Sequence, residues 1–182
     1  MTRTTTARIA GVAFLLYIAA GISSMALGSR PPATDLLSLL MSFSALALGV
    51  TLFAITRDQD RDLALFAMTC RIVESIPGDA RRSAIFFAVS SVIFCRLLLR
   101  GRMIPVTLAW LGVVASVLLV VILPLQLAGL LGGRTSWSTS VTWLVWLPML
   151  AFELALAFWL LIKGVASPAP RGARVEMQTI LE

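Results

Sequence analysis

The sequence predicts an all-α integral membrane protein, a bundle of six transmembrane helices. Hydrophobic residues make up 59% of the chain and charged residues only 13%, whereas soluble domains average about 45–50% and about 25%. The mean hydropathy is +0.94. Apolar runs long enough to cross a bilayer recur along the chain, and most of the arginines lie between them. Together these observations exclude an ordinary soluble domain and a disordered chain.

Five apolar runs approach the roughly 20 residues that a helix needs to cross about 30 Å of hydrocarbon. Residues 9–27 and 36–55 carry no charge, and 141–162 contains a single carboxylate. The run 103–131 exceeds the required length, so it can span with tilt or with a break near its proline. The run 84–99 falls short of that length, but the arginine near its end can extend toward the membrane interface.

The segment 63–76 is shorter still, contains Arg71 and Glu74, and stops at Pro77. Its length favours a half-span or an interfacial helix, but loop charge favours a crossing. With six spans, ten basic residues lie on the side of the N-terminus and four lie opposite. The ten are Arg3, Arg8, Arg57, Arg61, Arg96, Arg100, Arg102, Lys163, Arg171 and Arg174, and the four are Arg30, Arg81, Arg82 and Arg134. Five spans give eight against seven, so the positive-inside rule favours six, with the third segment short and ending at Pro77.

This topology predicts a multi-pass protein of the bacterial plasma membrane with both termini in the cytoplasm. Residues 1–165 form the polytopic membrane domain, and 166–182 form a flexible cytoplasmic tail. The first apolar run, 9–27, is longer than the core of a signal peptide, which usually has roughly 7–15 residues. We therefore expect a retained anchor rather than a signal peptide.

Several classes of chemistry lack their usual residues. The chain has no histidine, and its two cysteines, Cys70 and Cys95, lie in apolar runs without a paired spacing. Catalytic triads with histidine and most metal sites are therefore not expected, and we predict no metal and no cofactor. The arginines separate apolar runs rather than forming a basic stripe on a soluble face, so no nucleic-acid partner is expected. An enzymatic activity is disfavoured.

Polar residues inside the apolar runs are the candidate functional residues, because charges within a membrane are costly and normally have partners. At a rise of 1.5 Å per residue, Arg71, Glu153, Tyr17 and Ser91 all lie roughly 12–14 Å from the inner ends of their helices. Glu74 is one turn further along the helix of Arg71. We expect one intramembrane polar cluster, in which Glu153 is the favoured partner of Arg71 and Glu74 is the local alternative. It is either a structural clamp or a proton or ligand site.

Three pairs of small residues at a spacing of four allow helices to approach closely. They are Ala45 with Gly49, Gly112 with Ser116, and Ala151 with Ala155. Besides the lipid bilayer, we therefore expect a second copy of the chain as a partner, through helix faces of this kind.

Six short motifs follow one another along the chain: Ala7–Gly11, Arg71–Glu74, Arg102–Pro105, Leu108–Gly112, Phe152–Leu156 and Lys163–Gly164. In this order they resemble the bacterial membrane proteins grouped as domain of unknown function family 4386. The order of the motifs, rather than any single one, carries the resemblance. It implies a membrane-embedded fold of six helices with no assigned activity. The chain departs from the family after Glu74, where family members continue with a longer third hydrophobic segment.

Three functional classes follow. The leading class is a membrane protein that acts through interaction or assembly. The alternative is a small proton-coupled transporter or permease built around Arg71, Glu74 and Glu153. A membrane enzyme acting on a lipid is the least favoured, since it needs clustered aspartates or histidines at a membrane face, and the only aspartate cluster is the loop 58–62.

Overall fold

The computed structural model describes residues 2–27, 31–76, 78–130 and 140–166. These residues form six helices and no strand. The helices are α1 (Arg3–Leu27), α2 (Pro31–Thr56), α3 (Arg61–Ser75), α4 (Ala80–Arg100), α5 (Val106–Leu127) and α6 (Ser140–Ile162). All except α3 are long and apolar enough to cross a membrane. The predicted all-α membrane bundle is therefore confirmed for the described part of the chain.

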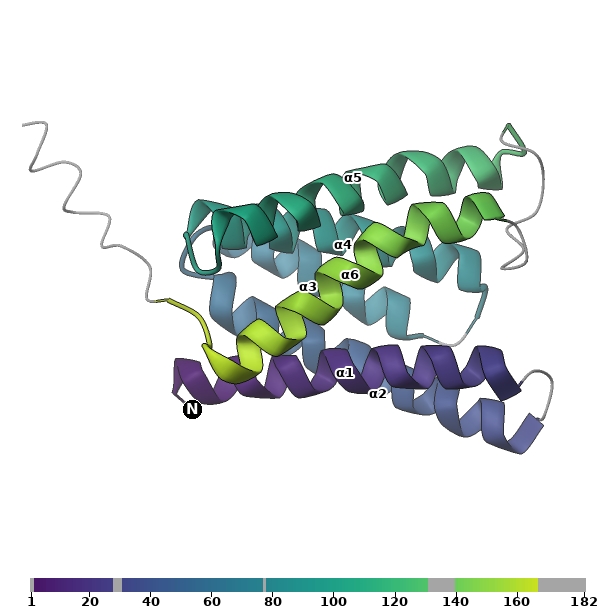
Figure 1. The fold of residues 1–182 in the computed structure, drawn as a ribbon, viewed down its shortest axis with the longest axis horizontal. Coiled ribbons are helices and arrows are strands. Elements are labelled where there is room, and N and C mark those ends of the chain that lie inside the picture. Colours follow the sequence, from purple (N-terminus) through teal and green to yellow (C-terminus); the bar gives the residue numbers. More distant parts are fainter. Residues whose placement is uncertain (1, 28–30, 77, 131–139, 167–182) are drawn as a thin grey trace, which may run out of the picture.

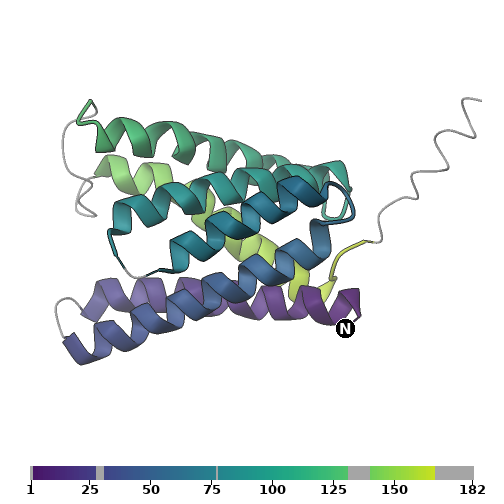
Figure 2. The ribbon, with the colours of Figure 1, turned by 180° about the vertical axis from the view of Figure 1, so that it is seen from behind.

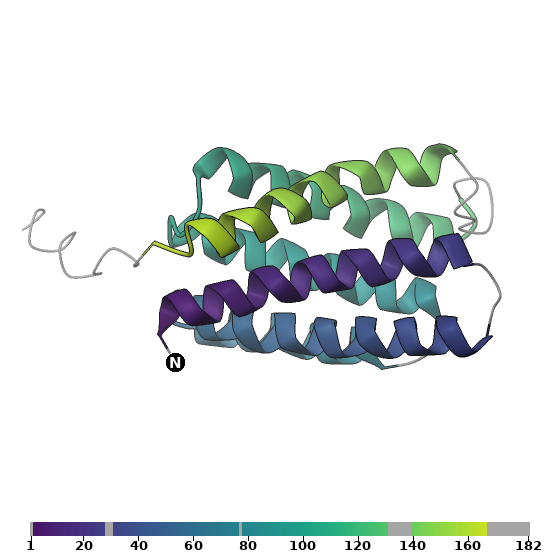
Figure 3. The same cartoon turned by 60° about the horizontal axis from the view of Figure 1, so that its bottom comes forward.

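The helices form a closed ring in chain order. Each helix packs against the next one, and α6 completes the ring by packing against α1 as well as α5. Figure 1 shows α6 crossing the front of the bundle diagonally, from the side of α5 to the side of α1. Figure 3 shows in a second view that α6 crosses α5 and approaches α1 toward its own end. The interior of the ring is consequently lined by several helices that are distant in sequence.

Contacts at one end of the bundle fix the direction of each helix. Arg3 forms an ion pair with Asp58, which joins the start of α1 to the end of α2. The backbone N–H of Ala166, after α6, donates to the carbonyl of Met103, before α5. The helices therefore alternate in direction, and the described chain begins and ends its bundle at the same end. An even number of helices in alternating directions requires this arrangement.

Helix α3 is short, as expected, and its ends have local causes. It begins where the side chain of Asp60 accepts a hydrogen bond from the N–H of Leu63 at 3.1 Å, a standard N-cap. It ends at Ser75, because Ile76 is extended (φ −73°, ψ 124°), as expected for a residue that precedes a proline. Pro77 itself lies outside the described residues. The 15 residues of α3 span about 22 Å at 1.5 Å per residue.

The shortness of α3 is visible from behind the bundle, where it stops before the start of α4 (Figure 2). Helix α4 has 21 residues and extends about 31 Å at the same rise. Helix α2 also touches α4 directly, in addition to its contact with α3.

Helix α5 ends earlier than the apolar run 103–131 predicts. It continues past Pro124 to Leu127, so the proline does not break it. Gly129 then adopts a left-handed conformation (φ 76°), its N–H donates to Gln126, and the N–H of Leu130 donates to Leu125. This is a Schellman motif, which satisfies the last carbonyls of the helix. The predicted tail begins at residue 166, and its residues 167–182 lie outside the described part.

Candidate functional site: a buried polar cluster inside the helix ring

The centre of the cluster is an ion pair in the last turn of α3. The guanidinium of Arg71 donates from Nη1 to both oxygens of Glu74, at 3.3 and 3.1 Å. The two residues are three apart on one helix, so their side chains lie on the same face. Only 1% of the Arg71 surface is exposed. A buried charge of this kind requires a partner, and Glu74 supplies it.

Two further helices contribute hydroxyl groups to this pair. Ser91 of α4 accepts a hydrogen bond from Arg71 Nη2 at 3.2 Å. Tyr17 of α1 donates its hydroxyl hydrogen to Glu74 Oε1 at 2.9 Å. The structure thus brings together four of the five predicted site residues in one network that connects α1, α3 and α4.

An aromatic residue that the sequence reasoning missed completes this network. The Arg71 guanidinium lies 4.7 Å from the ring centroid of Phe87, in cation–π geometry. The Phe87 ring is parallel to that of Tyr17, with centroids 6.3 Å apart, and it also contacts Trp146 of α6 at 5.6 Å. The signal was present in the sequence, because Phe87 lies one helical turn before Ser91 and therefore on the same face of α4.

A glycine of α2 makes room for the arginine stem. A Cβ atom added at Gly49 would lie 3.0 Å from Cβ of Arg71. Together with the buried Ala45, Gly49 lets α2 approach α3 closely, which is the packing role of such pairs.

Glu153 of α6 is the fifth predicted residue, and its expected pairing with Arg71 is wrong. Its side chain is buried, with 5% of the residue exposed, and Oε1 makes no hydrogen bond within the described chain. The ion pair of Arg71 is with Glu74. The reason is the ring order: α6 packs on α1 and α5, so depth matches α3 but the helices are not neighbours. The carboxyl group of Glu153 nevertheless interacts electrostatically with Arg71 and with Glu74.

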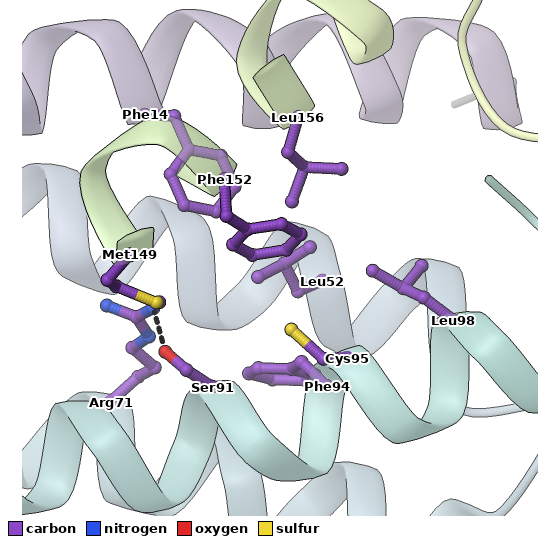
Figure 4. Close-up of a pocket in the computed structure, with 10 residues that line it drawn as sticks. All are labelled: Phe14, Leu52, Arg71, Ser91, Phe94, Cys95, Leu98, Met149, Phe152 and Leu156. Atoms are coloured by element: carbon purple, nitrogen blue, oxygen red, sulfur yellow. Dashed lines mark hydrogen bonds between the residues drawn. The ribbon is translucent and has the colours of Figure 1, made fainter. Parts of the chain in front are cut away.

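A small cavity adjoins the cluster (Figure 4). Arg71 and Ser91 line one part of it, and Cys95, Met149 and Phe152 are among the other lining residues. It offers about 10 Å³ to the centre of a water-sized sphere, close to the least space that one buried water needs. Arg71 Nε is buried and makes no hydrogen bond to the described chain. The cavity is too small for an organic substrate.

The three pairs of small residues lie in different surroundings: two pack inside the bundle and one is exposed. Ala45 and Gly49 are used inside the bundle, as are Gly112 and Ser116: a Cβ at Gly112 would lie 2.5 Å from the ring of Phe152 and 2.7 Å from Sγ of Cys95. Ala151 and Ala155, by contrast, are exposed on the outer face of α6. This third pair makes no internal packing contact that would explain its small side chains.

The cluster can hold charge, bind a proton or fix three helices, and its composition suits no metal. Among the described residues no group of three or more histidine, cysteine, aspartate or glutamate side chains is placed to hold a metal ion. The charged centre consists instead of one cation and two carboxylates, of which only Glu74 is paired.

The ring of apolar helices around a buried polar cluster defines a multi-pass helical membrane protein. Within this class, residues 82–164 match the family described as Domain of unknown function (DUF4386). The predicted resemblance is thereby confirmed over α4, α5 and α6, including the motifs Arg102–Pro105, Leu108–Gly112 and Phe152–Leu156. The motifs Ala7–Gly11 and Arg71–Glu74 precede the matched range and stay predictions. No curated protein and no solved structure matches the chain.

Proposed function

We propose that the protein acts by assembly in the bacterial plasma membrane, through contact between the outer face of α6 and a second copy of the chain. The observation that carries this proposal is the exposure of Ala151 and Ala155. Two of the three small-residue pairs serve internal packing, and the third faces outward on a helix that lies across the surface of the ring. Small residues let two helices approach closely in lipid, where van der Waals contact drives association.

The apolar residues around this pair support the same surface. Leu144, Leu147 and Phe158 are exposed on α6, at 71%, 58% and 52%. They flank the two alanines at helical spacings of three to four residues, so they form one stripe. Large side chains on both sides of a small centre suit helix packing between two copies.

The test is the double substitution Ala151→Leu and Ala155→Leu, with the mass of the purified protein measured in detergent and by photobleaching in vesicles. We expect the wild type to be oligomeric and the variant to be largely monomeric. Ala19→Leu is the matched control, because Ala19 is an exposed alanine on α1. A wild type that is monomeric at all protein-to-lipid ratios would contradict the proposal, as would equal association of the α6 variant.

The proposed orientation places the end that carries Arg3 and Ala166 in the cytoplasm. Exposed basic residues gather at that end, whereas Arg81 and Arg82 lie at the opposite one. The exposed residues of the first group are Arg8, Arg57, Arg61, Arg96, Arg100, Arg102 and Lys163. An excess of basic residues is typical of the cytoplasmic side.

A second candidate function, a proton-coupled permease, is favoured by one observation. Arg71, Glu74 and Glu153 are all buried in the ring interior, and ionisable residues at such depth commonly mark transport pathways. The small cavity supports passage of protons or water more than passage of a larger solute. A pH-sensitive dye inside vesicles distinguishes the candidates: a permease moves protons when a gradient is imposed, whereas an assembly protein leaves the internal pH unchanged.

A further inference from the structure

We propose that Glu153 is a proton-binding site that exchanges its proton with water while Arg71 is held by Glu74. This inference does not rest on assembly through α6, and it holds whether or not the chain transports a solute. It follows from the charges, the free hydrogen-bonding atoms and the space in the ring interior.

The buried cluster contains more acidic groups than cations. The cluster contains one cation, Arg71, and two buried carboxyl groups, Glu74 and Glu153. Arg71 and Glu74 neutralise each other through their ion pair. If Glu153 were also ionised, one surplus negative charge would lie in an apolar interior, which is strongly unfavourable. Binding of one proton at Glu153 removes that surplus.

Among the described residues, Arg71 is the one cation that interacts with Glu153. The charged and titratable groups around Glu153 are Tyr17 on α1, Arg71 and Glu74 on α3, and Cys95 on α4. Helix α5 carries no charged residue. Hard metal cations need several oxygen ligands, whereas the adjoining cavity is lined largely by apolar and sulfur-containing side chains such as Met149. A proton needs only the carboxylate itself.

One buried donor and one buried acceptor lack hydrogen-bond partners within the described chain. Arg71 Nε carries a hydrogen that no described group accepts, and Glu153 Oε1 is an acceptor that no described group uses. When Glu153 gives its proton to a water molecule, the new carboxylate and the guanidinium attract each other. Arg71 then has a spare N–H for Glu153 while Nη1 keeps Glu74. The cavity, which Arg71 and Ser91 line, has the space of about one water, so a water can lie against the guanidinium inside the ring.

The exchange therefore connects two charge states of one site. In the first state, Glu153 is a neutral acid and Arg71 is paired with Glu74 alone. In the second state, the proton has left as hydronium and Arg71 is shared between two carboxylates. Since Glu153 lies on α6 and Arg71 on α3, proton release draws together helices that are not neighbours in the ring.

Infrared spectroscopy of the full-length protein in vesicles tests this directly, because a protonated carboxyl group has its own C=O stretching band. We expect the wild type to show such a band near neutral pH, to lose it on titration to alkaline pH, and to regain it on return. Glu153→Gln should abolish the band, and Asp62→Asn, which changes an exposed carboxylate at the start of α3, should leave it unchanged. Absence of the band, or a band that survives in Glu153→Gln, would overturn the proposal.

Glu74→Gln separates proton exchange from a buried acid that is merely inert. This variant leaves one cation and one carboxylate, so Glu153 should become the partner of Arg71 and lose its proton at a pH lower by about one unit or more. An unchanged midpoint would overturn the proposal. Loss of the wild-type band on addition of sodium chloride at constant pH would do so too, since Glu153 would then hold Na⁺. Should Glu153→Gln not fold, Glu153→Asp replaces it: the band must then move in frequency.

Discussion

The two sides of the ring interior are held together by different interactions. On the side of α1, α3 and α4, the contacts are polar and directional: Arg71 bonds Glu74 and Ser91, and Tyr17 bonds Glu74. On the side of α5 and α6, the contacts are apolar and close, as where Gly112 adjoins Phe152. Glu153 is a buried carboxyl group on the apolar side, and its Oε1 makes no hydrogen bond within the described chain.

The difference shows what each kind of contact specifies. A polar network in a membrane fixes the identity of its partners, because a single unpaired charge is costly. Close apolar packing fixes the distance between helices but accepts any residue of suitable shape. We therefore expect substitutions on the polar side to depend on charge, and substitutions on the apolar side to depend on volume.

The largest effect is expected for Arg71→Met. It leaves Glu74 buried without its cation and also removes the contacts to Ser91 and Phe87. Removal of one partner from a buried ion pair costs about 3–5 kcal/mol, and the free energy of unfolding in mixed micelles measures it. Arg96→Met is the control, because Arg96 is exposed on α4; it should stay within about 0.5 kcal/mol of the wild type. Equal effects of the two variants would show that the ion pair does not stabilise the bundle.

Gly112→Ala tests the apolar side and should cost less. Its added methyl group would lie 2.5 Å from Phe152 and 2.7 Å from Cys95, so either α5 and α6 must move apart or the aromatic ring of Phe152 must rotate. Overpacking of this kind costs about 1–3 kcal/mol. Gly21→Ala is the matched control, since its nearest neighbour would be Met41 Cε at 3.8 Å. Thermal unfolding should distinguish the two variants, and a stable Gly112→Ala protein would mean that this contact is loose.

Both helix positions and much of the cluster could be predicted from the sequence. Apolar runs place α4 and α6 within about four residues of their observed ends and α1 and α2 within about six, because a bilayer imposes a length. Depth along each helix correctly brings Tyr17, Arg71 and Ser91 to one level, since the rise per residue is constant. The order of the helices around the ring has no such signal in the sequence. The prediction that Glu153 pairs with Arg71 was therefore wrong, and the contact of Phe87 with Arg71 was missed.

The termination of α5 illustrates the same limit. The apolar run 103–131 has no internal signal for where its helix stops, and Pro124 suggested a break. The structure keeps Pro124 in the helix and ends the helix at Leu127, two residues before Gly129, where a positive φ favours glycine. Hydropathy thus predicts that a helix is present, whereas capping residues decide where it ends.

Arg71→Met combined with Glu74→Met should cost less stability than Arg71→Met alone. The double variant removes both charges and replaces them with apolar side chains of adequate volume. Replacement of a complete buried ion pair in this way is often neutral, so most of the lost stability should return. Unfolding measured in the same micelles gives the coupling between the two sites. If the double variant were as unstable as Arg71→Met, the lost stability would come mainly from the hydrogen bonds of Tyr17 and Ser91 to the charged groups, and not from the attraction between the two charges.

The smallest effect is expected for Glu153→Gln. Because Arg71 is paired with Glu74, the substitution removes no ion pair, and glutamine has nearly the shape of a protonated glutamic acid. The free energy of unfolding near neutral pH should therefore change by no more than about 0.5 kcal/mol. Glu74→Gln at the same pH removes the anion that faces Arg71 and provides the contrast, with a loss that approaches that of Arg71→Met. Had Glu153 been the partner of Arg71, as depth alone predicts, the two glutamine variants would exchange their effects. A loss of several kcal/mol in Glu153→Gln would therefore show that Glu153 on α6 is paired with Arg71. It would contradict the assignment of Glu74 as the paired carboxyl group and Glu153 as the unpaired one.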